Sequence, residues 1–458
     1  MLGVVDVRAA RSCPSALDSV DHRSSVRKSS FLMSHDISLS AAARSLVAHS
    51  RILPELDAVT DDELDLLGAV VADARVVALG EGAHFVAEFG VARRRLLRYL
   101  VERCGFTVLA FEFGFAEACA LDAWLHGQGP ETALRTMIGT TNSGLDSTMA
   151  RWLRHYNTTG GHSVRLIGVD TPVSGGTLAP VLEPLIDYLT TVDPEHADLA
   201  RTALAIGARI EGASVGKAAL RWVELAEADR TALTAALSRL TVRMRALEPL
   251  YVARSDRARY DLAAQQLAIA VHTDYMFATI HGVLFGGPSL PMDGSVRDRV
   301  MADTLLWHLD RLDPDTRVVV MAHNNHIQKK PVEFDGPLAF SMGCYLADTL
   351  GDTYRAIALT HTADTVPDLY PDPDQPIGFT VTDTAMAPPP AGSVEGELIA
   401  AGLGSVVSLC NLRPLRNTPT NLSSIRGQSA QMPTPVPEAF DAVLTLPTIT
   451  TKVELTLA

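Results

Sequence analysis

The stretch Arg75-Val-Val-Ala-Leu79, continued by Gly-Glu-Gly-Ala-His84, indicates the fold most directly. Its branched aliphatic residues predict a short β-strand that is buried on both faces. The two glycines allow the chain to turn, and an amphipathic pattern then predicts a helix over residues 86–103. A strand that leads directly into a helix is typical of an open parallel sheet, which gathers its ligand-binding groups at the carboxyl ends of the strands. Glu81 and His84 are the chemically capable side chains at that position.

Three further strands are predicted in the same way, and each leads into polar residues. The apolar runs over 106–111, 164–168 and 317–321 precede Glu112, Asp170 and the pair His323 and His326, respectively. A fifth strand is predicted over 354–359, and helices are predicted over 115–126, 144–157, 295–312 and 338–350. Strands that alternate with helices predict an α/β protein with a mostly parallel central sheet flanked by helices.

The chain divides into five parts. Residues 1–32 lack the apolar segment of a signal peptide. Because Met33 is followed by the polar Ser-His-Asp and then by a helical pattern from Ser40, translation is expected to start at Met33, with residues 1–32 disordered. Residues 33–176, which begin with two helical patterns between Ser40 and Ala74, and residues 281–365 form the two parts of the α/β core. Residues 177–280 are helical in period almost throughout and predict an inserted helical lid. In the C-terminal extension, 366–458, the Pro-rich stretch 367–390 predicts an irregular loop, and short strands are expected around 404–410 and 441–455.

Composition excludes several classes of partner. The net charge of −14 and the pI near 5.4 repel polyphosphate, so neither nucleic acid nor a membrane surface is expected to bind. Five cysteines without a CxxC pair argue against a disulfide framework and favour a reducing, cytoplasmic location. The sequence has no run of about 18 apolar residues, so no membrane span is predicted. We expect a globular monomer or homodimer that acts on a small molecule.

The polar residues that follow the strands predict one shared site. The carboxyl ends of parallel strands meet at one edge of a sheet, so Glu81, His84, Glu112, His323 and His326 should lie together there. Arg93 lies on the apolar face of the helix over 86–103 and needs a carboxylate partner, which Glu81 or Glu112 could supply. Further candidates for the substrate pocket are Phe85, Asp170, Arg297 and Asp298.

Each of these residues also has a structural explanation. Glu81 could cap the next helix, His84 could belong to its first turn, and Glu112 could belong to a purely structural ion pair. Asp170 could end its strand at a turn, as acids commonly do. The sequence Arg297-Asp298 could satisfy the preference for an acid early in a helix.

Nucleophilic and cofactor-dependent catalysis have less support. Ser214 lies in Gly212-Ala-Ser-Val-Gly216, which has the letters of a nucleophile elbow but no strand before it. Cys344 has no activating partner nearby in sequence. Neither a Walker loop nor a complete dinucleotide motif is present, so no cofactor is expected. Water activated by a base remains, and histidine has a suitable pKa without special tuning.

Together these motifs resemble the erythromycin esterase family over roughly residues 45–365. The resemblance is carried by Leu-Gly-Glu81-Gly-Ala-His84 with Glu88-Phe89 and Arg93, Phe-Glu112 with Glu117, Arg297-Asp298-x-x-Met301-Ala302, Ala322-His323-Asn-x-His326-Ile and Met342-Gly343. The family usually has Thr and Gly at the positions of Ala83 and Phe85, and frequently Asn at the position of Thr304. The motifs occur in the family's order and with its spacings.

The resemblance implies an α/β core with a helical lid and metal-free hydrolysis of the lactone ester of 14-membered macrolides. It implies that His84 is the general base, supported by Glu81, Glu112, Arg93, His323 and His326. We therefore expect His84 to deprotonate a water that attacks an ester or lactone carbonyl. Glu81 and Glu112 would fix the imidazole and the water, and His323, His326 or Arg93 would stabilise the oxyanion.

Three alternatives use the same residues. A biosynthetic enzyme could use the base to activate a substrate hydroxyl for acyl transfer, cyclisation or elimination on a polyketide-like substrate, because Ala83 and Phe85 would make the pocket drier. A metal-dependent hydrolase could use His84, His323, His326 and one glutamate as zinc ligands. A protein that sequesters an antibiotic would bind it without catalysis.

Overall fold

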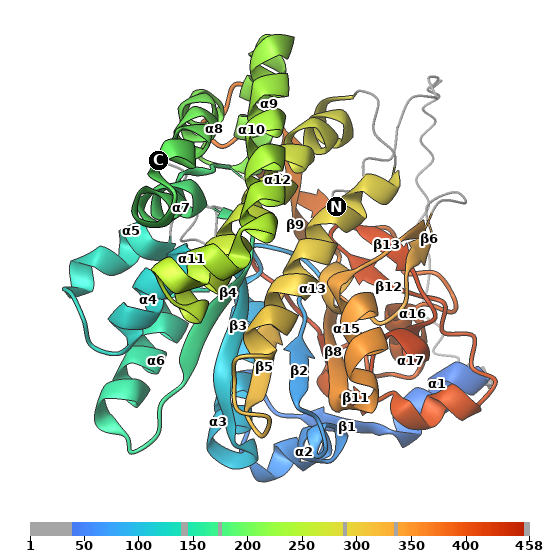
Figure 1. Ribbon diagram of the computed structural model, residues 1–458. Coiled ribbons are helices and arrows are strands. Elements are labelled where there is room, and N and C mark those ends of the chain that lie inside the picture. Colours follow the sequence, from blue (N-terminus) through green and yellow to red (C-terminus); the bar gives the residue numbers. More distant parts are fainter. Residues whose placement is uncertain (1–38, 139–144, 173–175, 287–290, 334–337, 453–458) are drawn as a thin grey trace, which may run out of the picture.

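A mixed sheet of eight strands forms the centre of the molecule (Figure 1). The structure is a computed structural model that describes residues 39–138, 145–172, 176–286, 291–333 and 338–452; the expectations for residues 1–32 and Met33 lie outside them. The sheet order is β1-β11-β14-β8-β2-β5-β3-β4, in which β11 is antiparallel to both of its neighbours, β1 and β14, and all strands from β14 to β4 are parallel. The strands are β1 Ser50–Leu53, β2 Val76–Leu79, β3 Phe106–Gly114, β4 Arg165–Asp170, β5 Arg317–Met321, β8 Tyr354–His361, β11 Val407–Asn411 and β14 Ala442–Leu446. The expected α/β fold is therefore confirmed.

Helices cover both faces of this sheet. Side chains of β2 alternate between two apolar cores, with Val77 and Leu79 in one and Val76 and Ala78 in the other. The first core contains α2 Asp65–Val71, α3 Ala87–Cys104, α4 Glu117–Leu125, α5 Leu134–Ile138 and α6 Ser147–Thr159. The second contains α1 Ala41–Ala48, α13 Ser295–Leu309, α14 Asn324–Ile327, α15 Met342–Leu350, α16 Val394–Ala400 and α17 Val436–Ala439. Burial on both faces explains why the central strands are almost continuously apolar.

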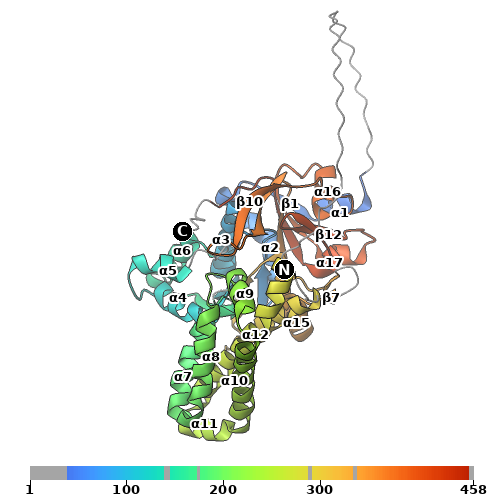
Figure 2. The same cartoon turned by 90° about the horizontal axis from the view of Figure 1, so that it is seen from above.

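Six helices between β4 and α13 form a third core at the carboxyl end of the sheet. They are α7 Ala179–Val192, α8 Ala197–Ile210, α9 Val215–Glu224, α10 Glu227–Ala246, α11 Glu248–Arg254 and α12 Arg257–Phe285. Phe115, which directly follows β3, is part of this core. Viewed from above, α7, α8, α10 and α11 extend away from the sheet (Figure 2). Among the described residues, α12 alone is long and apolar enough, by length and composition, to cross a membrane.

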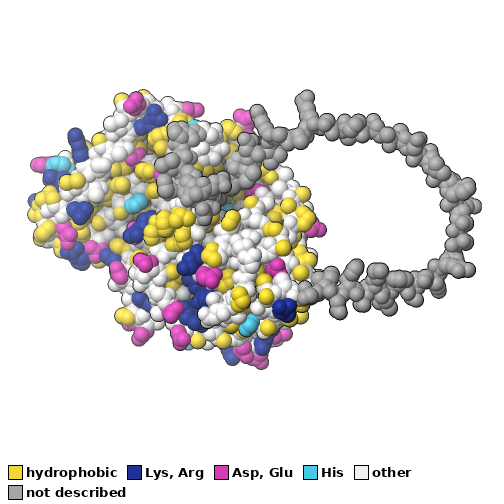
Figure 3. All heavy atoms as spheres, turned by 90° about the vertical axis from the view of Figure 1, so that its right-hand side faces the viewer, with side chains coloured by type: hydrophobic (Ala, Val, Ile, Leu, Met, Phe, Trp, Pro, Cys, Tyr) yellow, Lys and Arg dark blue, Asp and Glu magenta, His cyan; other side chains and the backbone are white. Residues whose placement is uncertain are grey.

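The C-terminal part of the chain differs from the expectation. The Pro-rich stretch is not irregular, because β9 Thr365–Pro371 pairs antiparallel with β10 Phe379–Ala385. Residues 404–446 are not a simple extension either, since β11 and β14 lie within the central sheet. Two further hairpins pair β12 Ser424–Gly427 with β13 Ala430–Pro433 and β6 Val332–Glu333 with β7 Leu338–Ala339. On the face in Figure 3, acidic and basic side chains are interspersed rather than gathered by sign.

Two local features were also predicted wrongly. The strand β1 was not expected between the first two helices. The helix expected over 338–350 begins only at Met342, because Ser341 caps it by accepting a hydrogen bond from the Cys344 amide. Single-turn 3-10 helices occur at Leu56–Ala58, Asp62–Leu64, Glu131–Ala133, Pro194–His196, Pro291–Gly294, Gly351–Thr353 and Arg413–Asn417.

Gly343 allows close packing against α14, the short helix that contains His326 and is capped by His323. A Cβ added at Gly343 would lie 2.2 Å from the Ile327 carbonyl oxygen and 2.4 Å from that of Gln328. Only glycine therefore lets α15 pack directly on the end of α14. This close approach explains the glycine of the Met342-Gly343 motif.

Candidate active site

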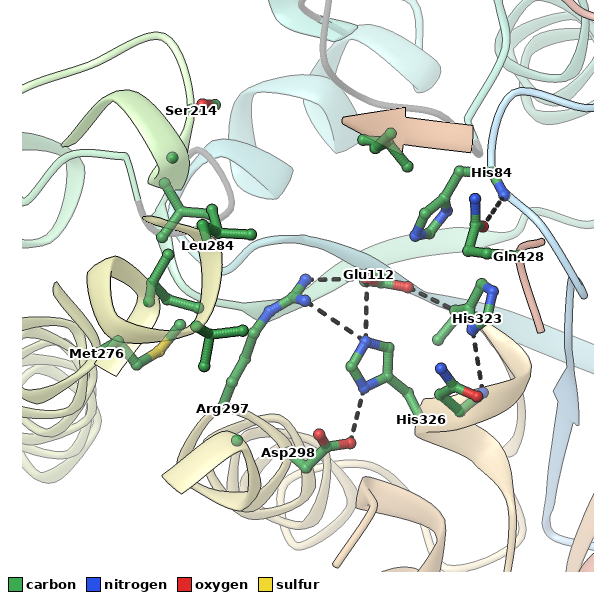
Figure 4. Close-up of a pocket in the computed structure, with 18 of the residues that line it drawn as sticks. His84, Glu112, Ser214, Met276, Leu284, Arg297, Asp298, His323, His326 and Gln428 are labelled. Carbon is green, nitrogen blue, oxygen red and sulfur yellow. Dashed lines mark hydrogen bonds and ion pairs between the residues drawn. The ribbon is translucent and has the colours of Figure 1, made fainter. Parts of the chain in front are cut away.

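One cavity of about 220 Å³ brings together the polar residues that follow the strands. Its lining includes nine of the ten residues predicted for the site. Figure 4 labels His84, Glu112, Arg297, Asp298, His323 and His326 among them. Asp170 is not part of the lining; it is buried behind the cavity, where Arg297 donates to it. The convergence follows from topology, because β2, β5, β3 and β4 are parallel neighbours and end at the same edge.

The loop after β2 holds His84 through Glu81. His84 Nδ1 lies 2.8 Å from Glu81 Oε1, and Arg93 Nη1 of α3 lies 2.8 Å from Glu81 Oε2. Arg93 is only 1% exposed and therefore has the carboxylate partner that its burial requires. Burial raises the pKa of the Glu81 carboxyl, but Arg93 and the hydrogen bond from His84 outweigh it and leave the pKa lowered. Glu81 is consequently an anion.

The contact with Glu81 selects the tautomer of His84. An ionised carboxylate only accepts hydrogen bonds, so the imidazole places its proton on Nδ1. In the neutral ring, Nε2 then carries the lone pair. The side chain of His84 is 25% exposed and lines the cavity. This arrangement presents a basic nitrogen, held in place from behind, at the cavity.

A second histidine and carboxylate pair lies across the cavity on α14 and α13. His326 Nδ1 lies 2.7 Å from Asp298 Oδ1, and His326 Nε2 lies 3.5 Å from Glu112 Oε1. The same Asp298 oxygen accepts a hydrogen bond from the Met342 amide at 2.8 Å. Asp298 thus does more than favour the start of its helix.

Glu112 and Arg297 connect the two pairs. Arg297 Nη2 donates to Glu112 Oε1 at 2.9 Å and to Asp170 Oδ2 at 2.5 Å, while the His323 amide donates to Glu112 Oε2 at 2.9 Å. Burial alone would raise the pKa of Glu112, but His326 and Arg297 hold it well below its ordinary value. Burial lowers the pKa of Arg297, and the charges of Asp170 and Glu112 more than reverse that effect. Both groups therefore stay ionised.

His323 is bonded to the main chain through both ring nitrogens. Its Nδ1 accepts from the Asn325 amide at 3.1 Å, so Nε2 carries the proton and donates to the Gly82 carbonyl oxygen at 3.2 Å. Burial, followed by the charges of His84 and His326, holds the pKa of His323 well below its usual range. The ring is thus neutral and packs 4.8 Å from the His84 ring centroid. His323 is also the N-cap residue of α14.

The rest of the cavity wall was not predicted from the sequence. Its apolar side is formed by α12, through Met276, Ile280, Val283 and Leu284, and by Leu369 of β9 and Phe379 of β10. One part of α12 packs in the helical core and another lines the cavity, so its apolar residues are not confined to one side of the helix. This distribution is the one sequence signal for the wall. Gln428, in the turn between β12 and β13, also lines the cavity and gives no signal in the sequence.

Two candidates that sequence reasoning set aside are structural residues. Ser214 caps α9 by accepting from the Lys217 amide, and its hydroxyl donates to the Ile377 carbonyl oxygen. Burial raises the pKa of the Cys344 thiol, which disfavours the thiolate. Within the described ranges, no three His, Cys, Asp or Glu side chains are grouped as a metal ion requires.

The fold and site define an α/β protein with paired histidines and carboxylates beside an apolar wall. The sequence profile of the erythromycin esterase family matches residues 101–449. Two relatives from Escherichia coli are each 33% identical to this chain. The alignment with erythromycin esterase type II covers 83% of this chain and 91% of that protein. The alignment with erythromycin esterase type I covers 84% of this chain and 93% of that protein. The chain therefore belongs to the erythromycin esterase family.

A solved structure in this family supports the same assignment. It is an erythromycin esterase mutant, EreC, in its open conformation, with 30% identity and a TM-score of 0.82. The alignment covers 88% of this chain and 98% of that one. The profile match begins after the loop that carries His84, so the family assignment does not depend on that loop.

The depressed pKa of Glu112 predicts how its contribution to stability depends on pH. The unfolded carboxyl, with an ordinary pKa of 4.5, takes up a proton before the folded one as pH falls. Its contribution is therefore fully present above pH 4.5 and is lost below it. Glu112→Gln should lower the free energy of unfolding by about 3 kcal/mol at pH 7, because it removes one partner of a buried ion pair. That loss should shrink by about 1 kcal/mol at pH 3.5.

Urea unfolding of both proteins at the two pH values measures this difference. Glu131→Gln is the matched control, since Glu131 pairs with Arg151 at the surface and should contribute little at either pH. A loss for Glu112→Gln that is equally large at pH 7 and pH 3.5 would contradict the assignment.

Proposed function

We propose that the protein is an ester hydrolase in which His84 activates water. The observation that carries this proposal is the chain of contacts from Arg93 through Glu81 to His84 Nδ1. It orients the imidazole so that Nε2 can take a proton from a water molecule in the cavity. The water oxygen then attacks the carbonyl carbon, and the imidazolium is stabilised by the anionic Glu81 behind it.

His326 is the group best suited to assist the oxygen of the reacting ester. The guanidinium of Arg93 donates to Glu81 and to the carbonyls of Gly80 and Ala322, and both nitrogens of His323 contact the main chain. His326 is instead held by side chains, with Asp298 at Nδ1 and with both Glu112 and the Arg297 guanidinium at Nε2. We assign to it donation of a proton to the oxyanion or to the leaving alkoxide.

A macrolide-type lactone is the substrate class to test first. The relatives with 33% identity are named erythromycin esterases, and the cavity has charged groups on the sheet side and apolar groups on α12. Such a cavity fits a large ring that is polar around its ester and apolar elsewhere. The helices α7–α12 would form the lid over it, and the open conformation named for EreC supports a part that closes in that protein.

Replacing the base gives the most direct test of the proposed mechanism. His84→Asn should lower kcat for erythromycin hydrolysis by about a thousandfold or more, because general-base catalysis is lost. The thermal unfolding midpoint should stay close to that of the wild type. His126→Asn is the matched control, since His126 also contacts a carboxylate, Asp122, but lies outside the cavity. Undiminished turnover by folded His84→Asn would refute the role of His84.

Isotope-labelled water separates hydrolysis from the biosynthetic alternative. In ¹⁸O-water, attack on the carbonyl should add the mass of one water to the lactone and place the label in the new carboxylate. Acyl transfer, cyclisation or elimination would leave the product unlabelled. Phe85 lines the cavity beside His84, and an aromatic wall reduces the space for water, so the two reactions must be compared.

Dialysis against a chelator tests the zinc-dependent alternative. Turnover should persist after dialysis, whereas its loss would favour zinc-dependent hydrolysis.

A further inference from the structure

The backbone is strained next to His84 and at a residue of a distant segment that contacts the same loop. Within the described residues, only Phe85 and Gln428 adopt a positive φ without being glycine, with values of 63° and 52°. Phe85 directly follows His84, and Gln428 contacts the same loop from the C-terminal part of the chain. Such a conformation is unfavourable for residues with a Cβ and persists where surrounding contacts enforce it.

Main-chain hydrogen bonds from the C-terminal part hold this loop. The Gln428 amide donates to the Gly82 carbonyl oxygen at 2.7 Å, and the Lys452 amide donates to the Phe85 carbonyl oxygen at 2.7 Å. A bond from the Ala87 amide to the Thr450 carbonyl oxygen, at 3.0 Å, extends the contact into the first turn of α3. Segments more than 300 positions away in the sequence therefore define the position of His84.

The side chain of Gln428 binds His84 itself. Gln428 Oε1 accepts a hydrogen bond from the His84 main-chain amide at 2.6 Å (Figure 4). Gln428 is only 8% exposed, so loss of this acceptor would leave the His84 amide without the partner it has here in a largely buried position. The bond fixes the peptide group from which the catalytic side chain extends.

The nitrogen of the Gln428 side-chain amide contacts the β9–β10 hairpin at the cavity. Gln428 Nε2 donates to Asp368 Oδ1 at 3.2 Å and to the Pro367 carbonyl oxygen at 3.4 Å. Asp368 precedes Leu369, and Leu369 lines the cavity with Phe379 from the paired strand. One carboxamide thus joins the backbone of the base to the β9–β10 hairpin that a substrate would touch.

We infer that Gln428 is a positioning residue that fixes His84 for proton transfer and links it to the β9–β10 hairpin. The inference rests on the proposed hydrolytic function. Gln428 acts through the backbone of His84 and makes no contact with the reacting atoms. Its effect should appear in kcat more than in KM, because misplacement of a base slows the chemical step even when the substrate still binds.

Substitutions of similar size separate the hydrogen bond from the packing. Gln428→Met fills similar space without an oxygen acceptor. Gln428→Glu keeps an oxygen acceptor for the His84 amide, and it is combined with Asp368→Asn so that the new carboxylate does not face the carboxylate of Asp368. Gln431→Met is the matched control, because Gln431 lies in the same β12–β13 hairpin and its Oε1 has no hydrogen-bond partner. Each variant is measured for kcat and KM on an ester that the wild type hydrolyses, and for amide hydrogen exchange of His84 in ¹⁵N-histidine-labelled protein.

Gln428→Met should lower kcat by about tenfold or more, with KM within about twofold and exchange of the His84 amide about tenfold faster. The double variant with Gln428→Glu and Asp368→Asn should recover most of the lost kcat because it restores the acceptor without facing two carboxylates. Gln431→Met should match the wild type in all three measurements.

Three results would overturn the inference: kcat of Gln428→Met within about twofold of the wild type, an equal fall in Gln431→Met, or no recovery in the double variant with Gln428→Glu and Asp368→Asn. The exchange measurement distinguishes this inference from the proposed function. If the wild type hydrolyses no ester, the proposed function fails, while protection of the His84 amide by Gln428 is still tested. If the His84 amide exchanges at the wild-type rate in Gln428→Met, that result alone would show that Gln428 does not fix the His84 backbone.

Discussion

The buried ion pair between Arg93 and Glu81 is the interaction on which the site depends. Arg93 also donates to the carbonyl oxygens of Gly80 and Ala322, at 2.9 and 2.5 Å, so it joins the ends of two neighbouring strands, β2 and β5. Removing one partner of such a pair leaves a buried charge and costs about 3–5 kcal/mol. The pair therefore fixes both the anionic state of Glu81 and the position of the carboxylate that holds His84. The loop, the strand ends and the orientation of the imidazole follow from it.

The two histidine and carboxylate pairs have different surroundings and therefore suit different roles. His84 with Glu81 is partly exposed at the cavity, whereas His326 with Asp298 is nearly buried and lies between Glu112 and Arg297. Ion pairing keeps Glu112 charged despite its burial, so the cavity presents a fixed arrangement of charge to a reacting ester. The apolar side chains of α12 complete the opposite wall. A cavity with charged groups on the sheet side and apolar groups on the α12 side suits a substrate whose ester is its main polar group.

Sequence patterns predicted the parts of this molecule that depend on local periodicity. Strands such as β2 and β5 are buried on both faces and could be recognised as apolar runs, and parallel pairing then required Glu81, Glu112 and His323 to converge. A lone Arg93 on an apolar helix face likewise required a carboxylate. The contact of Gln428 with His84 and the pairing of β9 with β10 could not be predicted, because they join distant segments or lie in a Pro-rich stretch that resembles a loop. The positive φ of Phe85 was equally hidden, since it is imposed by its neighbours and not by a glycine.

The tautomer of His84 is the central claim, and ¹⁵N NMR of the histidine side chains measures it directly. Histidine-labelled protein is compared with His84→Asn to assign the two ring nitrogens. The account predicts that neutral His84 carries its proton on Nδ1, toward Glu81, and that Nε2 has the shift of an unprotonated nitrogen. A proton on Nε2 in the neutral ring would contradict it, because the nitrogen assigned to accept a proton from water would then have no lone pair available.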